Sequence, residues 1–295
     1  MTSRTKAELL LLSITIIWGS TFVITKGLLE DISPFLYIAV RFILAAVVFG
    51  LVYRHVWKMD KPALMRGGIL GLLLFVGFAL QTVGLQYTTA SKSAFITGML
   101  VVLTPICQIM IERRLPKLGN VIGVVLVAVG LYFLTSPEGS EMNFGDWLTL
   151  GCALCFALYI VYLDMFGSKH DAAQLTFAQF AVAGIGGTIG TVLFERVVWN
   201  PSFELAGAIA YLTVFATVIA LFVQTKYQKE TTPTRAAVIF SVEPVFAAAF
   251  AYLILSEMIG PLGMVGGGLI VGGLLVSELS DVVFGSSPKR GLEEQ

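Results

Sequence analysis

Apolar residues in this chain form ten long runs, separated by short turns that are polar or rich in proline and glycine. A helix that crosses the hydrocarbon core needs about 20 mostly apolar residues, and each run has roughly that length. Turns this short leave no room for a soluble domain, so the pattern predicts an all-α integral membrane protein. The ten predicted spans are residues 7–27, 33–53, 66–86, 93–112, 117–136, 146–166, 174–194, 204–225, 235–255 and 260–280.

The composition supports this prediction. Hydrophobic residues make up 57% of the chain and charged residues 13%, against roughly 25% charged residues in an average soluble protein. Lipid must therefore cover most of the surface. The first run is long for the apolar region of a signal peptide and lacks a clean small-residue cleavage site, so we interpret it as a retained helix. No basic patch with interleaved aromatic residues is present, and no nucleic-acid partner is expected.

The cysteines and histidines suggest no cofactor and no metal site. Cys107, Cys152 and Cys155 all lie inside apolar runs, which argues against a disulfide framework. Cys152 and Cys155 have a C-x-x-C spacing, but on one face of a membrane helix we interpret them as small packing residues. His55 and His170 lie in turns that are far apart in the sequence.

The basic residues predict the orientation of the chain. If the N-terminus is cytoplasmic, the outside retains only Lys26, Lys92 and Arg196, and Arg41 lies within a span. A strong cytoplasmic excess of lysine and arginine is what membrane insertion favours, so both termini are expected in the cytoplasm of a cell with a bacterial-type inner membrane. The residues on the predicted inner side are Arg4, Lys6, Arg54, Lys58, Lys61, Arg66, Arg113, Arg114, Lys117, Lys169, Lys226, Lys229, Arg235, Lys289 and Arg290.

The ten spans also divide into two similar sets of five. Residues Tyr87–Ala94 resemble Tyr227–Ala236: each segment has a tyrosine, a short polar turn and an alanine-led helix with one interior proline, Pro105 or Pro244. An odd number of spans in each half inserts the second copy upside down. The predicted organisation is a first repeat at 1–136, an inverted second repeat at 137–281, and a short polar cytoplasmic tail at 282–295.

Several short motifs occur in the order typical of one transporter family. They are Trp18-Gly19-Ser20-Thr21-Phe22, Arg41-Phe42, Tyr87–Ala94, Glu243-Pro244-Val245-Phe246, and Ser256-Glu257-Met258 before a glycine-rich end. This pattern resembles the EamA-type transporters of the drug/metabolite transporter superfamily along nearly the whole chain. The resemblance implies an inverted repeat of ten helices that moves metabolites by alternating access. The second half departs from it, with Ala157-Leu158-Tyr159 where a Trp-Gly motif is expected.

Glu243 is the strongest functional candidate, because a charged side chain within a membrane span calls for an explanation. It directly precedes Pro244, whose ring removes one backbone hydrogen bond. Helix breaks at Pro105 and Pro244 would mark a site between the repeats, where Glu243 could carry a proton or bind a substrate amino group. A structural carboxyl bonded to Arg41 or to a freed backbone N–H is the alternative. Arg41 could meet a substrate carboxylate, but we favour a structural role.

Further candidates are polar or aromatic residues that recur on helix faces within the spans. Interhelical hydrogen bonds and simple packing are the alternative roles. The predicted substrate-binding residues are Trp18, Ser20, Thr21, Gln81, Thr97, Thr104, Gln108, Tyr159, Gln179, Gln224 and Glu243.

Taken together, these features predict a secondary transporter rather than an enzyme. The expected substrates are amino acids or similar amphipathic metabolites, moved by export; the export direction is implied by the family resemblance. The expected partners are the small-molecule substrate and the lipid bilayer, with proton coupling and a homodimer through glycine-rich helix faces as further hypotheses. The alternatives are a carrier for sugar phosphates, nucleotide sugars, drugs or vitamins, or, from another class, a channel or a membrane enzyme.

Overall fold

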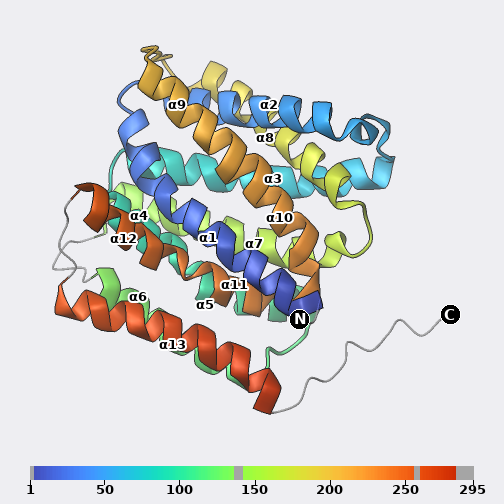
Figure 1. Ribbon diagram of the computed structural model, residues 1–295. Helices are drawn as coiled ribbons and strands as arrows, with labels where there is room; N and C mark the ends of the chain where they lie inside the picture. Colours follow the sequence, from blue (N-terminus) through green and yellow to red (C-terminus); the bar gives the residue numbers. More distant parts are fainter. Residues whose placement is uncertain (1–2, 136–141, 256–259, 284–295) are drawn as a thin grey trace.

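The structure, a computed structural model, describes residues 3–135, 142–255 and 260–283. The motif at Ser256-Glu257-Met258, the turn at 136–139 and most of the predicted tail at 282–295 lie outside the described residues. Helices account for most of the described chain (Figure 1). They are α1 (Ser3–Leu28), α2 (Pro34–Val52), η1 (Arg54–Lys58), α3 (Lys61–Leu85), α4 (Ala90–Gly98), α5 (Leu100–Glu112), α6 (Leu118–Thr135), α7 (Phe144–Gly167), α8 (Ala172–Phe194), α9 (Phe203–Tyr211), η2 (Leu212–Ile219), α10 (Ala220–Tyr227), η3 (Gln228–Glu230), α11 (Pro233–Phe240), α12 (Glu243–Leu255) and α13 (Pro261–Val283).

Each of the ten predicted spans corresponds to a helical segment of the structure. Eight segments are long and apolar enough to cross a membrane, and two shorter apolar helices lie at Leu118–Phe133 and Pro261–Ser277. The prediction of an all-α membrane protein is confirmed. Three spans are composite, because α4 is followed by α5, α9 by the π-helical η2 and α10, and α11 by α12.

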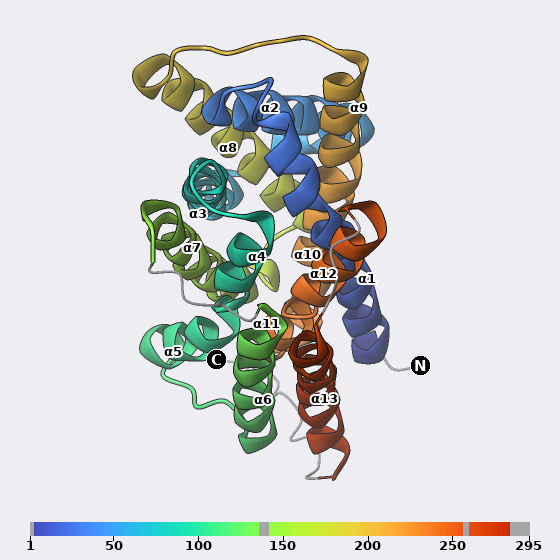
Figure 2. The ribbon, with the colours of Figure 1, turned by 90° about the vertical axis from the view of Figure 1, so that its left-hand side faces the viewer.

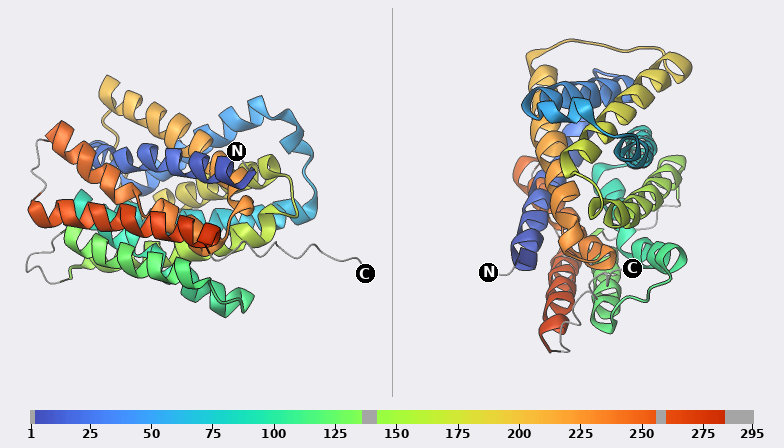
Figure 3. Two further views of the ribbon diagram at one scale, coloured as in Figure 1. Left: turned by 60° about the horizontal axis from the view of Figure 1, so that its bottom comes forward. Right: turned by 90° about the vertical axis from the view of Figure 1, so that its right-hand side faces the viewer.

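The helices pack as two related sets of five. In Figure 2, α6 and α13 lie side by side at one edge of the molecule, and α2 and α8 lie together at the opposite edge. Between these edges, α1 packs against α12 in the same way that α7 packs against α5. Figure 3 shows that the long helices share one general direction. This pairing of equivalent helices is the arrangement expected of two inverted repeats.

Glycines allow the closest approaches between these helices. A Cβ atom at Gly123 would lie 2.8 Å from the carbonyl oxygen of Gly273, and one at Gly130 would lie 2.7 Å from that of Gly266. Small residues at such contacts let two backbones approach within the membrane. Glycines of the fifth and tenth spans thus join α6 to α13 within the chain.

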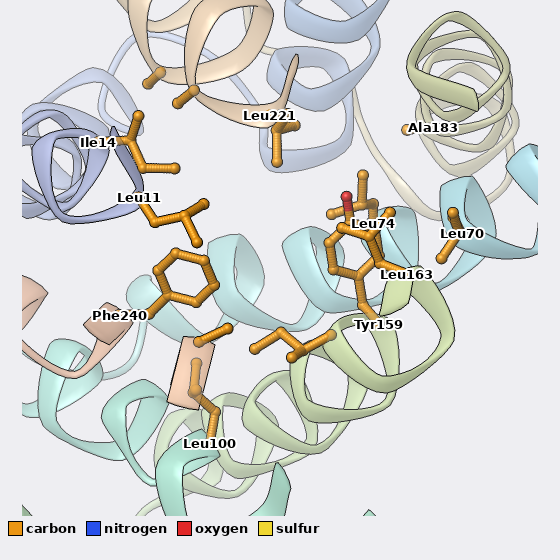
Figure 4. Packing of buried hydrophobic residues seen from close by; sticks show 14 of the residues in the cluster. Leu11, Ile14, Leu70, Leu74, Leu100, Tyr159, Leu163, Ala183, Leu221 and Phe240 are labelled. Atoms are coloured by element: carbon orange, nitrogen blue, oxygen red, sulfur yellow. The ribbon is translucent and has the colours of Figure 1, made fainter. Parts of the chain in front are cut away.

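Large apolar side chains fill the space between the two sets. Figure 4 shows Leu11, Leu100, Tyr159, Leu221 and Phe240 converging from five different helices. Many other large apolar residues point outward; Phe203, for example, is 99% exposed. An exterior of this kind suits a hydrocarbon surrounding. The interior packing instead surrounds the cavity described below.

Candidate functional site

A central cavity lies where the broken helices of both sets meet. It contains about 590 Å³ of empty space when its open mouth is included, and about 70 Å³ of this is available to the centres of water molecules. Helices α1, α2, α3, α4, α5, α7, α10, α11 and α12 all contribute to its wall. The lining residues are Trp18, Thr21, Arg41, Leu74, Phe78, Gln81, Thr97, Leu100, Phe156, Tyr159, Ile160, Leu221, Gln224, Phe240 and Glu243.

Seven of the eleven predicted substrate-binding residues line this cavity. They come from six helices, so only the tertiary fold brings them together. The structure shows that these residues line one cavity. That each of them contacts the substrate stays a prediction. These residues are Trp18, Thr21, Gln81, Thr97, Tyr159, Gln224 and Glu243.

The other four predicted residues lie outside the cavity wall and bond within the protein. Ser20 Oγ lies 2.9 Å from the hydroxyl of Tyr211, and Thr104 Oγ1 donates to the carbonyl oxygen of Leu100 at 2.7 Å. Gln108 accepts a hydrogen bond from Thr234 at 2.7 Å.

Gln179 lies behind the wall, where its Oε1 accepts a hydrogen bond of 2.9 Å from the Tyr159 hydroxyl. Gln179 is fully buried, and its hydrogen bond orients the side chain of Tyr159. In this structure it can affect a substrate only through Tyr159.

Arg41 lines the cavity although the sequence favoured a structural role. Its Nε donates to Thr217 Oγ1 at 2.5 Å, and one terminal nitrogen donates to the Tyr37 hydroxyl at 2.8 Å. The guanidinium also lies 4.8 Å from the centre of the Phe78 ring, a distance at which a cation is attracted to the ring face. Among the described residues no carboxylate pairs with Arg41. The guanidinium is thus held in place without a counter-charge.

Glu243 is the acidic member of the wall. It is the first residue of α12, directly after the break that follows Phe240, and its side chain is half-buried. The start of a helix is a favourable place for a carboxylate because the backbone dipole is positive there. Within the part of the chain that the structure describes, no hydrogen-bond or ion-pair partner contacts its carboxyl group. The alternative of an internal Glu243–Arg41 pair therefore has no support in this geometry.

The two helix breaks occupy equivalent positions of the repeats. Residues Thr88–Leu100 align with Thr231–Glu243 without a gap. Thr89 caps α4 by accepting from the backbone N–H of Lys92 at 3.1 Å, and Thr232 caps α11 in the same way. The first break follows Gly98 and the second follows Phe240. In this alignment Ala94 corresponds to Ala237, one residue after Ala236, which the sequence predicted as its match.

The two prolines are not equivalent in this register. Pro244 is the second residue of α12 and lies at its break, but Pro105 is inside α5, well after the break at Met99. The predicted break at Pro105 is therefore placed by the structure one to two turns earlier in the chain. A capped, short α4 rather than a proline accounts for the first break.

The cavity wall follows the same internal symmetry. Gln81 and Gln224 take equivalent places, as do Phe78 and Leu221, Thr97 and Phe240, and Trp18 and Phe156. Phe156 thus takes the place of Trp18 in the second repeat, which lacks the Trp-Gly motif. The charges break the symmetry, because Glu243 corresponds to Leu100 and Arg41 corresponds to Gln179. One half supplies a cation to the cavity and the other half supplies a carboxyl group.

Comparison with known proteins agrees with the architecture. The model of the EamA-like transporter family matches residues 5–136 and 143–279. An uncharacterized transporter of Archaeoglobus fulgidus is 34% identical over 277 residues, which is 94% of this chain and 87% of that protein. An S-adenosylmethionine/S-adenosylhomocysteine transporter of Chlamydia trachomatis is 28% identical over 268 residues, 83% of this chain and 80% of the relative.

A solved structure shares the fold. It superimposes with a TM-score of 0.79 at 19% identity and covers 96% of this chain and 100% of its own. The matches extend across both sets of helices, including the broken helices that form the cavity. The chain is a multi-pass membrane transporter of metabolites, and it belongs to the EamA-like transporter family.

Proposed function

We propose that this protein is a secondary transporter of small zwitterionic metabolites, amino acids or similar amphipathic compounds, which it exports by alternating access. The observation that carries the proposal is the cavity, in which a guanidinium without a carboxylate partner and a carboxyl without a basic partner share one wall. Charges removed from water are stable when they are paired. A ligand with its own carboxylate and ammonium would supply both missing partners.

Arg41 would hold the carboxylate of such a ligand. Its Nε donates to Thr217 and one terminal nitrogen to Tyr37, and the other terminal nitrogen donates to the Ala216 carbonyl oxygen at 3.5 Å. These bonds fix the plane of the guanidinium. Guanidinium groups bind carboxylates through parallel N–H donors, and this geometry favours a planar anion. Glu243 would accept from the ammonium, and the paired glutamines Gln81 and Gln224 would contact other polar atoms of the ligand.

The relatives are consistent with this class of ligand. S-adenosylmethionine, which the chlamydial relatives are described as carrying, bears an α-amino acid group and a flat aromatic base. Trp18, Phe78 and Phe156 give the cavity of this chain aromatic surfaces on which a ring could stack. We therefore include this compound in the candidate substrates.

Sugar phosphates and nucleotide sugars fit the cavity less well. They carry more than one negative charge, while Arg41 is the basic residue of the described wall and Glu243 would repel them. Drugs and vitamins remain alternative substrates of the same superfamily. A membrane enzyme and a channel are the alternatives from other classes, and saturable counterflow separates a carrier from both.

Four finer points belong to the same proposal. Glu243 would carry the proton if transport is coupled to a pH gradient. Both termini would face the cytoplasm of an inner membrane, because of the lysine and arginine bias. Export is the direction that the resemblance favours. A homodimer would use glycines of α13 that have open space beside them, such as Gly268 and Gly272.

The test is counterflow in proteoliposomes, with a panel of labelled amino acids and S-adenosylmethionine, with and without an imposed pH gradient. Wild-type protein should show saturable uptake of at least one zwitterion. Glu243→Gln should abolish uptake or make it independent of the gradient, and Arg41→Gln should lower affinity for the carboxylate-bearing ligand. Asn120→Ala, which removes a bond to Ser277 outside the cavity, is the matched control and should transport normally.

Each alternative gives a different result. Uptake that ignores Glu243→Gln would make this residue structural and leave the transporter assignment standing. Folded protein that moves no compound of the panel would reject the zwitterion class. Drugs, vitamins and phosphorylated sugars would then be the next candidates.

A further inference from the structure

Two ion pairs with buried carboxylates lie outside the cavity and occupy equivalent places in the two repeats. The first joins Lys92 of α4 to Asp146 of α7, with Nζ 2.6 Å from Oδ2. Asp146 is fully buried, and it also accepts from the Thr88 hydroxyl at 2.7 Å and from the backbone N–H of Asn143 at 2.8 Å. A carboxylate this enclosed depends on all of these donors, because an uncompensated buried charge is strongly destabilising.

The second ion pair joins Arg235 of α11 to Glu8 of α1. Arg235 Nε lies 2.8 Å from Glu8 Oε1, and both side chains are nearly inaccessible, at 3% and 9% exposed. Thr231 donates its hydroxyl to the same oxygen at 3.0 Å, and Arg4 donates to it at 2.8 Å. Glu8 is therefore surrounded by donors, as Asp146 is.

The gapless register of the repeats makes these two clusters counterparts. Lys92 aligns with Arg235, and Thr88 aligns with Thr231. The carboxylates stand near the starts of α1 and α7, the first helices of the two repeats. A basic residue, a threonine and a carboxylate thus recur in the same roles. Chance would not be expected to place three matched contacts at matched positions.

Inversion of the repeats puts the clusters at opposite ends of the molecule. Counting the spans along the chain, α4 and α7 begin at one face, and α1 and α11 begin at the other. In Figure 1, α4 lies toward one end of the bundle and the N-terminus of α1 toward the other. The cavity lies between them: Trp18 and Phe156 are each about 15 Å along their helices from Glu8 and Asp146 respectively.

Both clusters also join one repeat to the other. In the first pair, Lys92 belongs to the first repeat and Asp146 to the second. In the second pair, Glu8 belongs to the first repeat and Arg235 to the second. A movement that separates the repeats at one face must therefore break the pair at that face. The pair at the other face can stay closed.

We propose that Lys92–Asp146 and Glu8–Arg235 are the two alternating gates of this transporter, one at each face of the cavity. This inference rests on the alternating-access part of the proposed function, but not on the substrate. Opening one face separates its pair and hydrates both ions, which limits the energetic cost of breaking it. Removing the basic partner leaves the carboxylate uncompensated in the closed form, so the open form of that face becomes favoured.

Thiol labelling of the cavity from each face tests the gates without any substrate. Thr21→Cys supplies the probe, in a Cys155→Ser background that removes the half-buried native thiol. A small membrane-impermeant methanethiosulfonate is added to right-side-out spheroplasts and to inside-out vesicles, and the ratio of the two labelling rates is measured. Exposed Arg196→Cys, in the loop between α8 and α9, identifies the face of Lys92.

Lys92→Gln should raise the labelling rate from its own face relative to the other by about tenfold, the effect of about 1.4 kcal/mol. Arg235→Gln should shift the ratio in the opposite direction by a similar factor. Arg196→Gln is the control at the first face, since Arg196 is exposed in the loop between α8 and α9. Lys226→Gln is the control at the second, since Lys226 contacts the rings of Phe222 and Tyr227 in its own repeat; neither control should move the ratio.

A conservative variant keeps the proposal testable if a neutralising variant fails to fold. Lys92→Arg keeps a positive charge opposite Asp146 and should keep the wild-type ratio. The gate assignment is overturned if both neutralising variants shift the ratio the same way, or if folded variants leave it unchanged. A shift by Lys92→Arg as large as that by Lys92→Gln would likewise overturn it. Failure of the substrate panel would leave these outcomes unaffected.

Discussion

Arg41 Nε donates a hydrogen bond of 2.5 Å to Thr217 Oγ1, which links the guanidinium of the cavity to the π-helical segment η2. A π-helical stretch shifts the register of the side chains around a helix and is frequent at functional sites. Here it brings Thr217 to Arg41, and Ala216 offers its carbonyl oxygen both to Arg41 at 3.5 Å and to Trp18 Nε1 at 3.0 Å. Two residues of the cavity wall are thus oriented by the same segment.

Thr217→Val should raise the KM for transport by about tenfold, because a hydrogen bond to a charged group contributes about 1.5–3 kcal/mol and Arg41 would lose its orientation. The maximal rate should change less. Thr213→Val is the matched control, since the Thr213 hydroxyl is buried on the same segment and has no hydrogen-bond partner among the described residues. Equal kinetics for the two variants in reconstituted counterflow would show that Thr217 does not position Arg41.

Gly19→Ala should disrupt the site by separating α1 from α12. A Cβ at Gly19 would lie 2.7 Å from Phe246 Cβ, 2.9 Å from the backbone nitrogen of Ala247 and 3.0 Å from the carbonyl oxygen of Glu243. Overpacking of this kind costs about 1–3 kcal/mol, and here the displaced backbone carries Glu243. We expect a lower melting temperature and loss of most transport.

Gly27→Ala provides the control for this prediction on the same helix. A Cβ at Gly27 meets no atom within 4 Å, and alanine is the better helix former. Its melting temperature and transport should equal or exceed those of wild type. A Gly19→Ala protein that behaves like Gly27→Ala would refute the close approach of α1 and α12.

Gly130→Ala should destabilise the α6–α13 pair while leaving the cavity residues in place. The added methyl would meet the Gly266 carbonyl oxygen at 2.7 Å and the Ile270 nitrogen at 2.9 Å, at a cost of about 1–3 kcal/mol. Thermal unfolding in detergent should show a lower midpoint. Gly207→Ala, within α9 and with open space around its Cβ, should not lower the midpoint, and an equal fall in both variants would contradict the interpretation.

Glu195→Ala should weaken the pairing of α2 with α8. The two carboxylate oxygens of Glu195 accept the backbone N–H groups of Phe35 at 2.8 Å and Leu36 at 3.2 Å, at the start of α2. Loss of a helix cap costs about 0.5–2 kcal/mol, so the unfolding midpoint should fall. Glu204→Ala, in the first turn of α9, is the comparison and should lower the midpoint less. A Glu195→Ala protein with the wild-type midpoint would exclude a capping role.

The sequence by itself determined the number and the approximate limits of the spans, and the inverted duplication that an odd number of spans in each half requires. Both follow from local physics, because each span must satisfy its own backbone and present apolar side chains to lipid. It also indicated Trp18, Thr21, Gln81 and Glu243, since polar or charged residues in such runs need a reason to be there.

Only the tertiary structure decided which of the candidates share a cavity. Ser20, Gln108 and Gln179 have the same polar character as the residues of the wall, but neighbouring helices hold them in internal hydrogen bonds. The break before Pro105 and the position of Arg41 in the cavity wall were likewise decided by packing, since a capped short helix and a π-helical segment leave little local signal. Contacts between residues far apart in the chain depend on which helix faces meet, and the periodicity of a single span does not specify that.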